Sequence, residues 1–266
     1  DTNHSQASAR AGADGSVWVS WQEASGGGLW VAEHNPTITS GSCASHGGSS
    51  EWNCYNVDTI GTTYMRANIA INPESKPVVS YYDDDVDLWV AEYVGSGGDC
   101  DDSAWNCYQV DTINDAATSG NTAIGIAVDE NGRAFICYNN DPSGSIMMAE
   151  YVGAGGTGCD IASWTCTTVL SGFSLDYSDL ALDSEGNPHI VAKINNTPSR
   201  TRHMEYVGSG GDCTNTAWEC TDIQNTMSVL VPRIAIDSQD RAWVSMQEWS
   251  VGCSGTCDLW VAYQDP

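Results

Sequence analysis

Apolar and polar residues alternate in short runs along most of the chain. Between Arg66 and Thr112, such runs cover residues 66–72, 77–82, 88–94 and 105–112, and Gly, Asn, Asp or Pro lies between them. A period of two over four to eight residues is typical of β-strands, and turn residues between the runs favour hairpins. No segment has a sustained period of 3.6 residues, so we expect almost no helix.

One stretch of the sequence recurs with small changes. Residues 88–111 read LWVAEYVGSGGDCDDSAWNCYQVD, residues 146–169 read IMMAEYVGAGGTGCDIASWTCTTV, and residues 201–222 read TRHMEYVGSGGDCTNTAWECTD. A looser copy begins at Leu29 and a truncated copy at Leu259, so successive copies start 55 to 59 residues apart. A regular period of about this length is typical of a propeller blade or a solenoid coil.

The number of runs in each repeat favours the propeller. Four antiparallel strands in each of five units predict an all-β fold, a five-bladed β-propeller that forms one domain. We place the blades at about 5–59, 60–112, 113–170, 171–224 and 225–266. The fifth unit has no Trp-x-Cys segment after Gln264, so we expect its sheet to lack the outer strand. An open edge can pair with another chain, although Gln264, Asp265 and Pro266 could equally leave a solvated edge.

Ten of the eleven cysteines form pairs that are close in sequence. The pairs are Cys43 and Cys54, Cys100 and Cys107, Cys159 and Cys166, Cys213 and Cys220, and Cys253 and Cys257. Zinc is the alternative, but a structural zinc site gathers four ligands from two close pairs, and here each pair lies in a separate unit. We therefore expect one disulfide per blade and an oxidising, extracellular or cell-surface location. Cys137 stands where the other units have Ser or Ala, which favours a small buried residue over a reactive thiol.

The charge of the chain excludes one class of partner. The 35 acidic and 9 basic residues give a formal net charge of −26. Nucleic-acid binding requires clustered Lys and Arg, so no nucleic-acid partner is expected. No apolar run approaches the roughly 20 residues of a membrane-spanning helix, so we expect no membrane span.

Two segments resemble a known type of repeat. Residues 80–93 read SYYDDDVDLWVAEY and residues 183–192 read DSEGNPHIVA. They are similar to the pattern D-x-x-G-x-P-h-h-x-Y-Y-D…L-x-h-A, where h is hydrophobic, of secreted bacterial β-propeller repeat proteins. The resemblance spans all five units and implies a propeller in a cell-surface or extracellular protein. The Asp-box S-x-D-x-G-x-T-W of sialidase-type propellers is nowhere intact, so the resemblance does not imply a sialidase.

The innermost strands offer the first candidate site, because one face of each would point into a central channel. Alignment of the units places Ser8, Asn68, Gly125, Asp179 and Arg233 at one level, and Gln6, Arg66, Ala123, Tyr177 and Val231 two residues earlier. The functional interpretation is a pocket for an anionic or hydroxyl-rich ligand, formed by Arg66, Asn68, Tyr177, Asp179 and Arg233. The alternative is that the Arg and Asp side chains neutralise each other around a hydrated channel.

An acidic loop offers a second candidate site. Asp83, Asp85 and Asp87 have a D-x-D-x-D spacing in which alternate carboxylates can converge on Ca²⁺. Leu88 stands where an EF-hand loop has Gly, and no Glu follows at its twelfth position. A solvated acidic turn is therefore the alternative.

No catalytic residue is assigned. Glu33, Glu92, Glu150 and Glu205 recur once per unit, whereas glycosidic cleavage needs two carboxylates about 5–10 Å apart, so we interpret them as structural partners. The five histidines occupy different repeat positions, and no triad or histidine metal site is predicted from them.

These features favour a secreted, non-enzymatic module, for which two versions compete. In the first, the protein is a structural subunit that assembles with copies of itself into an extracellular fibre or surface layer, through the open edge of the fifth blade. In the second, it is a lectin-like module that binds an extracellular glycan or anion at the mouth of the channel. A propeller glycoside hydrolase or lyase is the alternative from another class, because a fold alone does not fix a function.

Overall fold

The fold is all-β, as the alternating pattern predicted. The computed structural model describes residues 7–23, 27–46, 48–59, 66–83, 85–113, 124–140, 144–195, 199–224, 229–248 and 258–264. Within these ranges the helical content is one 3-10 turn, η1 (Ser42–His46). No helix in the described ranges has the length and apolarity needed to cross a membrane.

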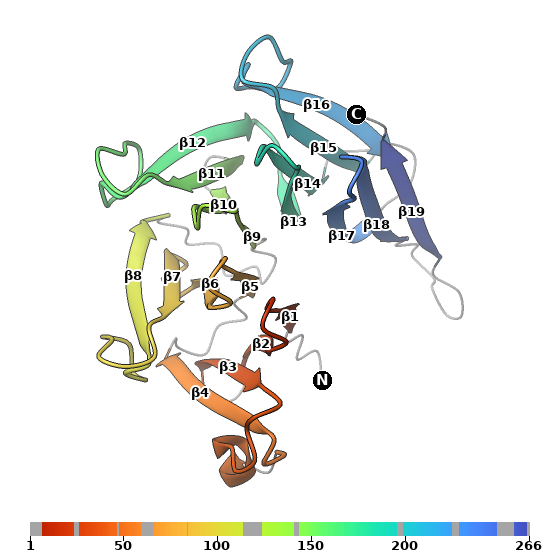
Figure 1. Cartoon of the computed structure of the whole chain (residues 1–266). Coiled ribbons are helices and arrows are strands. Elements are labelled where there is room, and N and C mark those ends of the chain that lie inside the picture. Colours follow the sequence, from red (N-terminus) through yellow and green to blue (C-terminus); the bar gives the residue numbers. More distant parts are fainter. Residues whose placement is uncertain are drawn as a thin grey trace. The chain divides into compact units, whose positions relative to one another are not determined.

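The strands form five antiparallel sheets in chain order (Figure 1). The first sheet contains β1 (Ser8–Ala11), β2 (Val17–Gln22), β3 (Gly28–His34) and β4 (Trp52–Thr59). The second contains β5 (Ala67–Ile71), β6 (Pro77–Tyr82), β7 (Leu88–Tyr93) and β8 (Trp105–Asp111). The third contains β9 (Ile124–Val128), β10 (Ala134–Asn140), β11 (Ser145–Tyr151) and β12 (Trp164–Ser171). The fourth contains β13 (Leu175–Leu182), β14 (Pro188–Ile194), β15 (Arg200–Tyr206) and β16 (Trp218–Gln224). The fifth contains β17 (Val229–Ile236), β18 (Ala242–Glu248) and β19 (Leu259–Gln264).

This arrangement confirms the prediction of one four-stranded meander per repeat. In the described residues the fifth sheet has three strands, so the predicted loss of its outer strand is also confirmed. The contacts divide the chain into two compact units, Asp1–Gly120 with Val128–Arg133, and Asn121–Ala127 with Ala134–Pro266. The first two sheets belong to the first unit, and the last two belong to the second. A single domain with the blade boundaries given above stays a prediction.

The tryptophan of the Trp-x-Cys segment is a core residue in the second, third and fourth sheets. In the first unit Trp105 is fully buried and packs edge-on against Trp18, with ring centroids 6.3 Å apart. In the second unit Trp164 and Trp218 are buried in the same way. These large side chains explain why the repeat keeps Trp at the start of its outer strand, since each one buries a large apolar surface.

Four disulfides staple the loop before the outer strand to that strand. They join Cys43 to Cys54, Cys100 to Cys107, Cys159 to Cys166, and Cys213 to Cys220. The expectation of one disulfide per blade therefore needs correction to four disulfides in the first four sheets, because Cys253 and Cys257 lie outside the described residues. Disulfides of this kind persist in an oxidising compartment. Cys137 is unpaired and buried as predicted, and burial raises the pKa of its thiol to about 12.

The glycines of the stapled loop are required by a close backbone approach. A Cβ added at Gly98 would overlap the carbonyl oxygen of Trp105, and the same holds for Gly156 against Trp164 and for Gly211 against Trp218. The recurring G-G of the repeat thus lets the loop fold back against the first residue of the outer strand.

The turn between the first two strands of a sheet has a recurring cap. Asp129 Oδ1 accepts hydrogen bonds from the N–H groups of Asn131 (2.9 Å) and Arg133 (2.8 Å). Asp183, Asp237 and Asn72 accept the same pair of backbone bonds in the turns of the fourth, fifth and second sheets. An Asx side chain at this position therefore closes the hairpin in the second to fifth sheets, whereas the first sheet has Gly12 there.

Asp129→Ala should lower the free energy of unfolding by about 2 kcal/mol, because Asp129 is buried and its two backbone donors would lose their acceptor. Asp129→Asn is the matched control and should retain most of the stability, since Asn72 has the same role in the second sheet. Urea unfolding followed by tryptophan fluorescence measures both variants. An equal loss in the two variants would contradict the role given to the cap.

Candidate ligand-binding site

The predicted channel residues of the first unit contact each other. Ser8 Oγ donates a 2.6 Å hydrogen bond to Asn68 Oδ1, and the Asn68 side chain is buried. Arg66 lies directly before β5 and is half-buried. Gln6 and Ala123, from the second predicted level, lie outside the described residues.

The predicted channel residues of the second unit also meet. Asp179 Oδ2 accepts a 3.1 Å hydrogen bond from the N–H of Ile234, and Arg233 Nη1 lies 4.0 Å from Asp179 Oδ1. Tyr177 and Val231 occupy equivalent positions with φ of 43° and 49°, which bulky side chains rarely adopt, and the strand register shifts beside both. The opposite charges of Asp179 and Arg233 therefore lie near each other. A ligand pocket formed by Arg66, Asn68, Tyr177, Asp179 and Arg233 stays a prediction.

The acidic loop uses its carboxylates for internal hydrogen bonds. Asp83 Oδ1 accepts from the N–H groups of Asp85 and Asp87, and Asp83 Oδ2 accepts from Trp89 Nε1 at 2.8 Å. Asp87 accepts from the N–H of Ile113 and from Gln109 Nε2, both at 2.9 Å. These three aspartates are not among the groups of potential metal ligands that converge in the described residues. Calcium binding by Asp83, Asp85 and Asp87 stays a prediction.

The recurring glutamates pair with the outer strand in the first unit. Tyr55 donates its hydroxyl to Glu33 at 2.9 Å, and Tyr108 donates to Glu92 at 2.7 Å. Burial is the main reason that the pKa of Tyr55 lies far above its usual range, and the negative charge of Glu33 adds to the effect. This is the structural pairing that the sequence indicated. The third and fourth sheets depart from it, because Thr167 and Thr221 stand at the position of these tyrosines.

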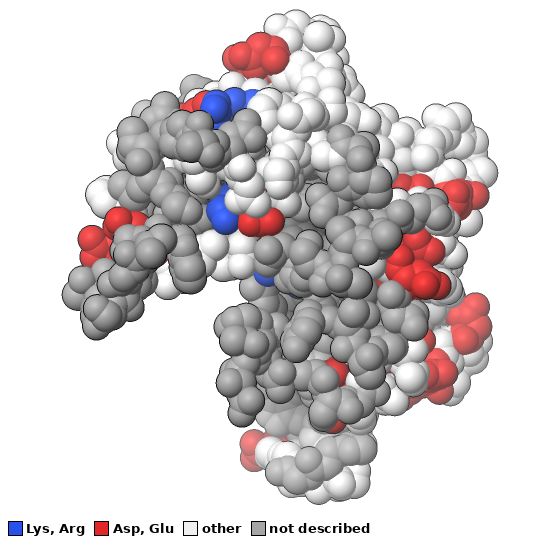
Figure 2. Space-filling view, turned by 180° about the vertical axis from the view of Figure 1, so that it is seen from behind, with Lys and Arg blue, Asp and Glu red and all other residues white. Residues whose placement is uncertain are grey.

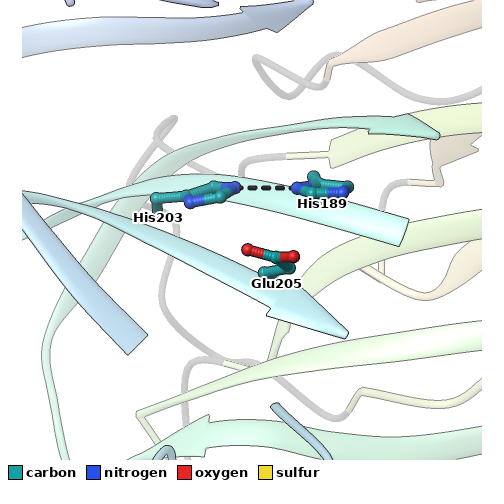
Figure 3. Close-up of side chains that lie close together, drawn as sticks. All are labelled: His189, His203 and Glu205. Carbon is teal, nitrogen blue, oxygen red and sulfur yellow. Dashed lines mark hydrogen bonds between the residues drawn. The ribbon is translucent and has the colours of Figure 1, made fainter. Parts of the chain in front are cut away.

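Two histidines and a glutamate of the fourth sheet lie close together (Figure 3). His189 belongs to β14, and His203 and Glu205 belong to β15. His189 is directly opposite Glu205 in the strand register, and His203 lies two residues before Glu205, so all three side chains leave the same face of the sheet. Their ligand atoms lie within 4.8 Å of one another.

The two imidazoles form the middle of a chain of polar contacts. His189 Nδ1 lies 3.1 Å from His203 Nε2, and His203 Nδ1 lies 3.2 Å from Gln264 Oε1 on β19. At the other end, His189 Nε2 is 3.6 Å from Asp183 Oδ2 and makes no hydrogen bond in the described part of the chain. Both rings are buried, and burial lowers the pKa of His203 to about 4, helped by the positive charge that His189 can carry.

A cavity of about 290 Å³ lies beside this chain, between the fourth and fifth sheets. It is lined by His203, Thr221, Ile223, Ala242, Val244, Ala262, Tyr263 and Gln264. Ala242, Ala262 and Thr221 have small side chains that leave the space between the two sheets unfilled. Ile223 and Val244 make part of the cavity surface apolar. His203, Thr221 and Gln264 bring hydrogen-bonding groups to the same space.

The exposed aromatic pair of the fifth sheet lies on the face opposite to the cavity. Tyr263 is 59% exposed and stacks on Trp243, with ring centroids 5.0 Å apart and an interplanar angle of 26°. Tyr263 is directly opposite Trp243 in the strand register, and both alternate with Ala242, Val244 and Ala262, whose side chains leave the other face toward the cavity. The two rings therefore do not form the apolar wall of the cavity.

The surface charge is scattered. Figure 2 shows acidic side chains in several separate groups over one face, with the few visible basic side chains next to acidic ones. Arg200 and Arg202 both bind Asp222, at 2.8 and 2.7 Å, so these two cations are neutralised by pairing. The expectation that the protein does not bind nucleic acid stays a prediction.

The histidine cluster corrects one expectation from the sequence. No histidine site was predicted because no two histidines share a repeat position, but His189 and His203 lie on neighbouring strands of one sheet. The signal was present in the spacing. Once Glu205 is paired with its opposite residue, as Glu92 is with Val78, the register places His189 across from it.

Comparisons with protein-family models and with curated protein sequences found no match. Comparison with solved structures shows similarity to the fucose-binding lectin of Aleuria aurantia, which is described as a six-bladed β-propeller. The sequence identity is 15%, the alignment covers 98% of this chain and 78% of that chain, and the TM-score is 0.53. A second structure of this lectin, in complex with α-methyl-L-fucoside, has 13% identity, coverage of 97% and 77%, and a TM-score of 0.55. A polysaccharide lyase, an ulvan lyase with bound -[GlcA(1-4)Rha3S]-, has 10% identity, coverage of 98% and 68%, and a TM-score of 0.56. At these identities the likeness shows the β-propeller fold alone.

The free energy of unfolding should fall as the pH is lowered from about 6.5 to about 4, because the unfolded chain binds a proton at His203 that the folded chain excludes. The loss attributable to His203 is at most about 3 kcal/mol, reached once the pH is below 4. Urea unfolding over this range, compared between the parent protein and His203→Gln, isolates this contribution from that of the carboxylates. Identical pH slopes in the two proteins would contradict the assignment.

Proposed function

We propose that this protein is a secreted, non-enzymatic glycan-binding module built on a five-bladed propeller, and that the cavity between the fourth and fifth sheets holds the sugar. One observation carries the proposal: the cavity combines hydrogen-bonding side chains with an apolar wall. Ligand sites are concave and largely apolar, with a few well-placed polar groups.

The chemistry of a sugar ring fits these features. Its C–H groups pack on apolar side chains, and Ile223 and Val244 offer such a surface in the cavity. Its hydroxyl groups need donors and acceptors, which Thr221 and Gln264 supply. A space of about 290 Å³ is enough for a monosaccharide and too small for a long segment of a chain.

The structural neighbours add support, because they include a lectin in complex with a fucoside and a lyase with a bound saccharide. The channel residues predicted from the sequence have less support as the binding site. In the second unit Asp179 and Arg233 lie near each other, and in the first unit Asn68 is buried and bonded to Ser8. We therefore propose that the sugar binds between the outer strands of the fourth and fifth sheets.

Thr221→Tyr should weaken binding of the glycan at least about tenfold, or about 1.4 kcal/mol, because a tyrosine at this position, as at Tyr55 of the first sheet, would fill part of the cavity. A glycan array identifies the ligand, with methyl α-L-fucoside as the first probe, and calorimetry measures the affinity. The matched control is Thr167→Tyr, which makes the same change at the equivalent, exposed position of the third sheet and should leave the affinity unchanged.

Two results would overturn the proposal. Full binding by Thr221→Tyr, together with loss in Arg233→Ala, would move the site to the channel. Release of unsaturated oligosaccharides from an acidic polysaccharide such as ulvan would assign the protein to the lyases instead.

A second candidate function is self-assembly through β19, and the exposure of this strand favours it. Leu259 and Val261 are 74% and 59% exposed, whereas the equivalent residues Leu29, Val31, Leu88 and Val90 are fully buried. Among the described residues, β19 pairs with β18 alone, so one edge of β19 offers free backbone groups to a strand of a second copy.

Val261→Lys should convert any polymer or dimer of the protein to monomers, because it places a charge on the face that a second copy would cover. Sedimentation velocity measures the mass at several concentrations. Val207→Lys is the control, since Val207 is 44% exposed in a loop of the fourth sheet and lies away from this edge. A parent protein that stays at 28.4 kDa at every concentration would end the assembly proposal.

A further inference from the structure

We infer that His189, His203 and Glu205 form a binding site for a divalent transition-metal ion of the zinc class. Two imidazoles and one carboxylate are a common ligand set for such ions. The three side chains project from one face of the fourth sheet, and their ligand atoms lie within 4.8 Å of one another (Figure 3). The other such group in the described residues, Asp212 with Cys213 and Cys220, has both sulfurs in a disulfide and offers no thiolate.

The number of N–H protons on His189 and His203 is too small for the three polar contacts that the two rings make, which indicates a bound cation. At its two ends the row of contacts reaches hydrogen-bond acceptors, Asp183 Oδ2 beside His189 and Gln264 Oε1 beside His203. Each imidazole therefore has to donate its N–H to the acceptor at its own end. Two neutral imidazoles carry two N–H groups in total, but the chain has three contacts. If both rings donate outward, two lone pairs face each other across the 3.1 Å between His189 Nδ1 and His203 Nε2. A metal ion held by these two nitrogens removes that conflict.

The distances suit such an ion after a small rotation of the rings. In a tetrahedral site with metal–nitrogen bonds of about 2.0–2.1 Å, two ligand nitrogens lie roughly 3.3 Å apart. The observed 3.1 Å between the facing nitrogens is close to that value. In Figure 3 the carboxylate of Glu205 lies to one side of the line between the rings, where it can supply the third ligand.

The groups around the rings match the surroundings of metal-binding histidines. Such histidines usually donate their second N–H to a carboxylate or an amide oxygen, which fixes the tautomer and orients the ring. Gln264 Oε1 is placed to do this for His203, and Asp183 Oδ2 is placed to do it for His189. His189 Nε2 is buried without a hydrogen bond in the described part of the chain, so a small shift that closes the 3.6 Å gap to Asp183 would satisfy it.

The cluster is particular to one sheet. At the position of His189 the first three sheets have Trp18, Val78 and Phe135, and at the position of His203 they have Val31, Val90 and Met148. Apolar residues at these positions are sufficient to build the first three sheets. Burial of two polar imidazoles in the fourth sheet costs free energy, and packing alone does not require it. Binding of a metal ion would explain why the two histidines are there.

The proposal is tested on the intact, folded protein after chelation and dialysis, without any glycan. Calorimetry with zinc chloride should show one site per chain with micromolar or tighter affinity, and cobalt(II) should give the visible absorption of a tetrahedral complex. Calcium and magnesium should not bind at this site, because two imidazole ligands disfavour hard cations. His203→Gln should abolish zinc binding, and Glu205→Gln should weaken it by about tenfold or more.

The controls separate the site from the fold and from other histidines. His34→Gln removes a half-buried histidine that packs on Trp52 of the first sheet, and it should bind zinc like the parent protein. Near-ultraviolet circular dichroism confirms that each variant is folded. If His203→Gln does not fold, Glu205→Gln still tests the site.

Absence of zinc binding by the parent protein would overturn the proposal. That result is expected if the Gln264 amide is turned over, because Gln264 would then donate to His203 and two neutral rings would satisfy the whole chain. Zinc binding that survives both variants would also overturn it.

Discussion

The antiparallel register between the second and third strands of a sheet decides which side chains share a face, and the rest of the structure depends on it. In the first four sheets a glutamate of the third strand lies opposite a residue of the second: Glu33 opposite Trp18, Glu92 opposite Val78, Glu150 opposite Phe135, and Glu205 opposite His189. A slip of one residue would turn every such side chain to the other face. The stapled loop and the buried Trp of the outer strand help to hold this register.

Because the register is the same in these sheets, the side chains on one face of the fourth sheet differ from those of the first sheet while the strand pairing stays the same. In the first sheet this face is filled by Trp18, Val31 and Tyr55, which pack in the core shared with the second sheet. In the fourth sheet the same positions hold His189, His203 and Thr221, and the space toward the fifth sheet becomes a cavity with polar groups. Small residues across from it, Ala242 and Ala262, keep that space open. Recognition of a sugar and binding of a metal ion are thus proposed for neighbouring parts of one altered face.

The fold was largely predictable because its signals are local. Period-two runs, Asx and Gly turns, and Trp-x-Cys segments each act over a few residues, and together they gave the strands, the four described disulfides and the three-stranded last sheet. The alignment of repeats also brought together Ser8 with Asn68 and Asp179 with Arg233. The alignment did not show how close the charges of Asp179 and Arg233 lie, because that depends on distances between sheets.

The histidine cluster and the cavity were not predictable by comparing equivalent repeat positions. His189 and His203 occupy different positions of one repeat, and their meeting depends on the pairing of β14 with β15. The cavity depends on residues that are small or short where other repeats are large, such as Thr221 in place of Tyr108. A repeated sequence pattern shows which residues occur at each position. It does not show where the side chains of two facing sheets are both too small to fill the space between the sheets, which is where a cavity forms.

The most direct test of the account is to map the residues that sense a bound sugar. Methyl-labelled protein is titrated with the glycan selected by the array, and nuclear magnetic resonance follows the methyl groups of Ile223, Val244, Ala242 and Ala262 beside those near the inner strands. The account predicts saturable shifts at these four residues and at Thr221, with little change at Val231 or Leu180. Shifts confined to Val231, Leu180 and other residues beside Arg233 would contradict it and return the binding site to the channel.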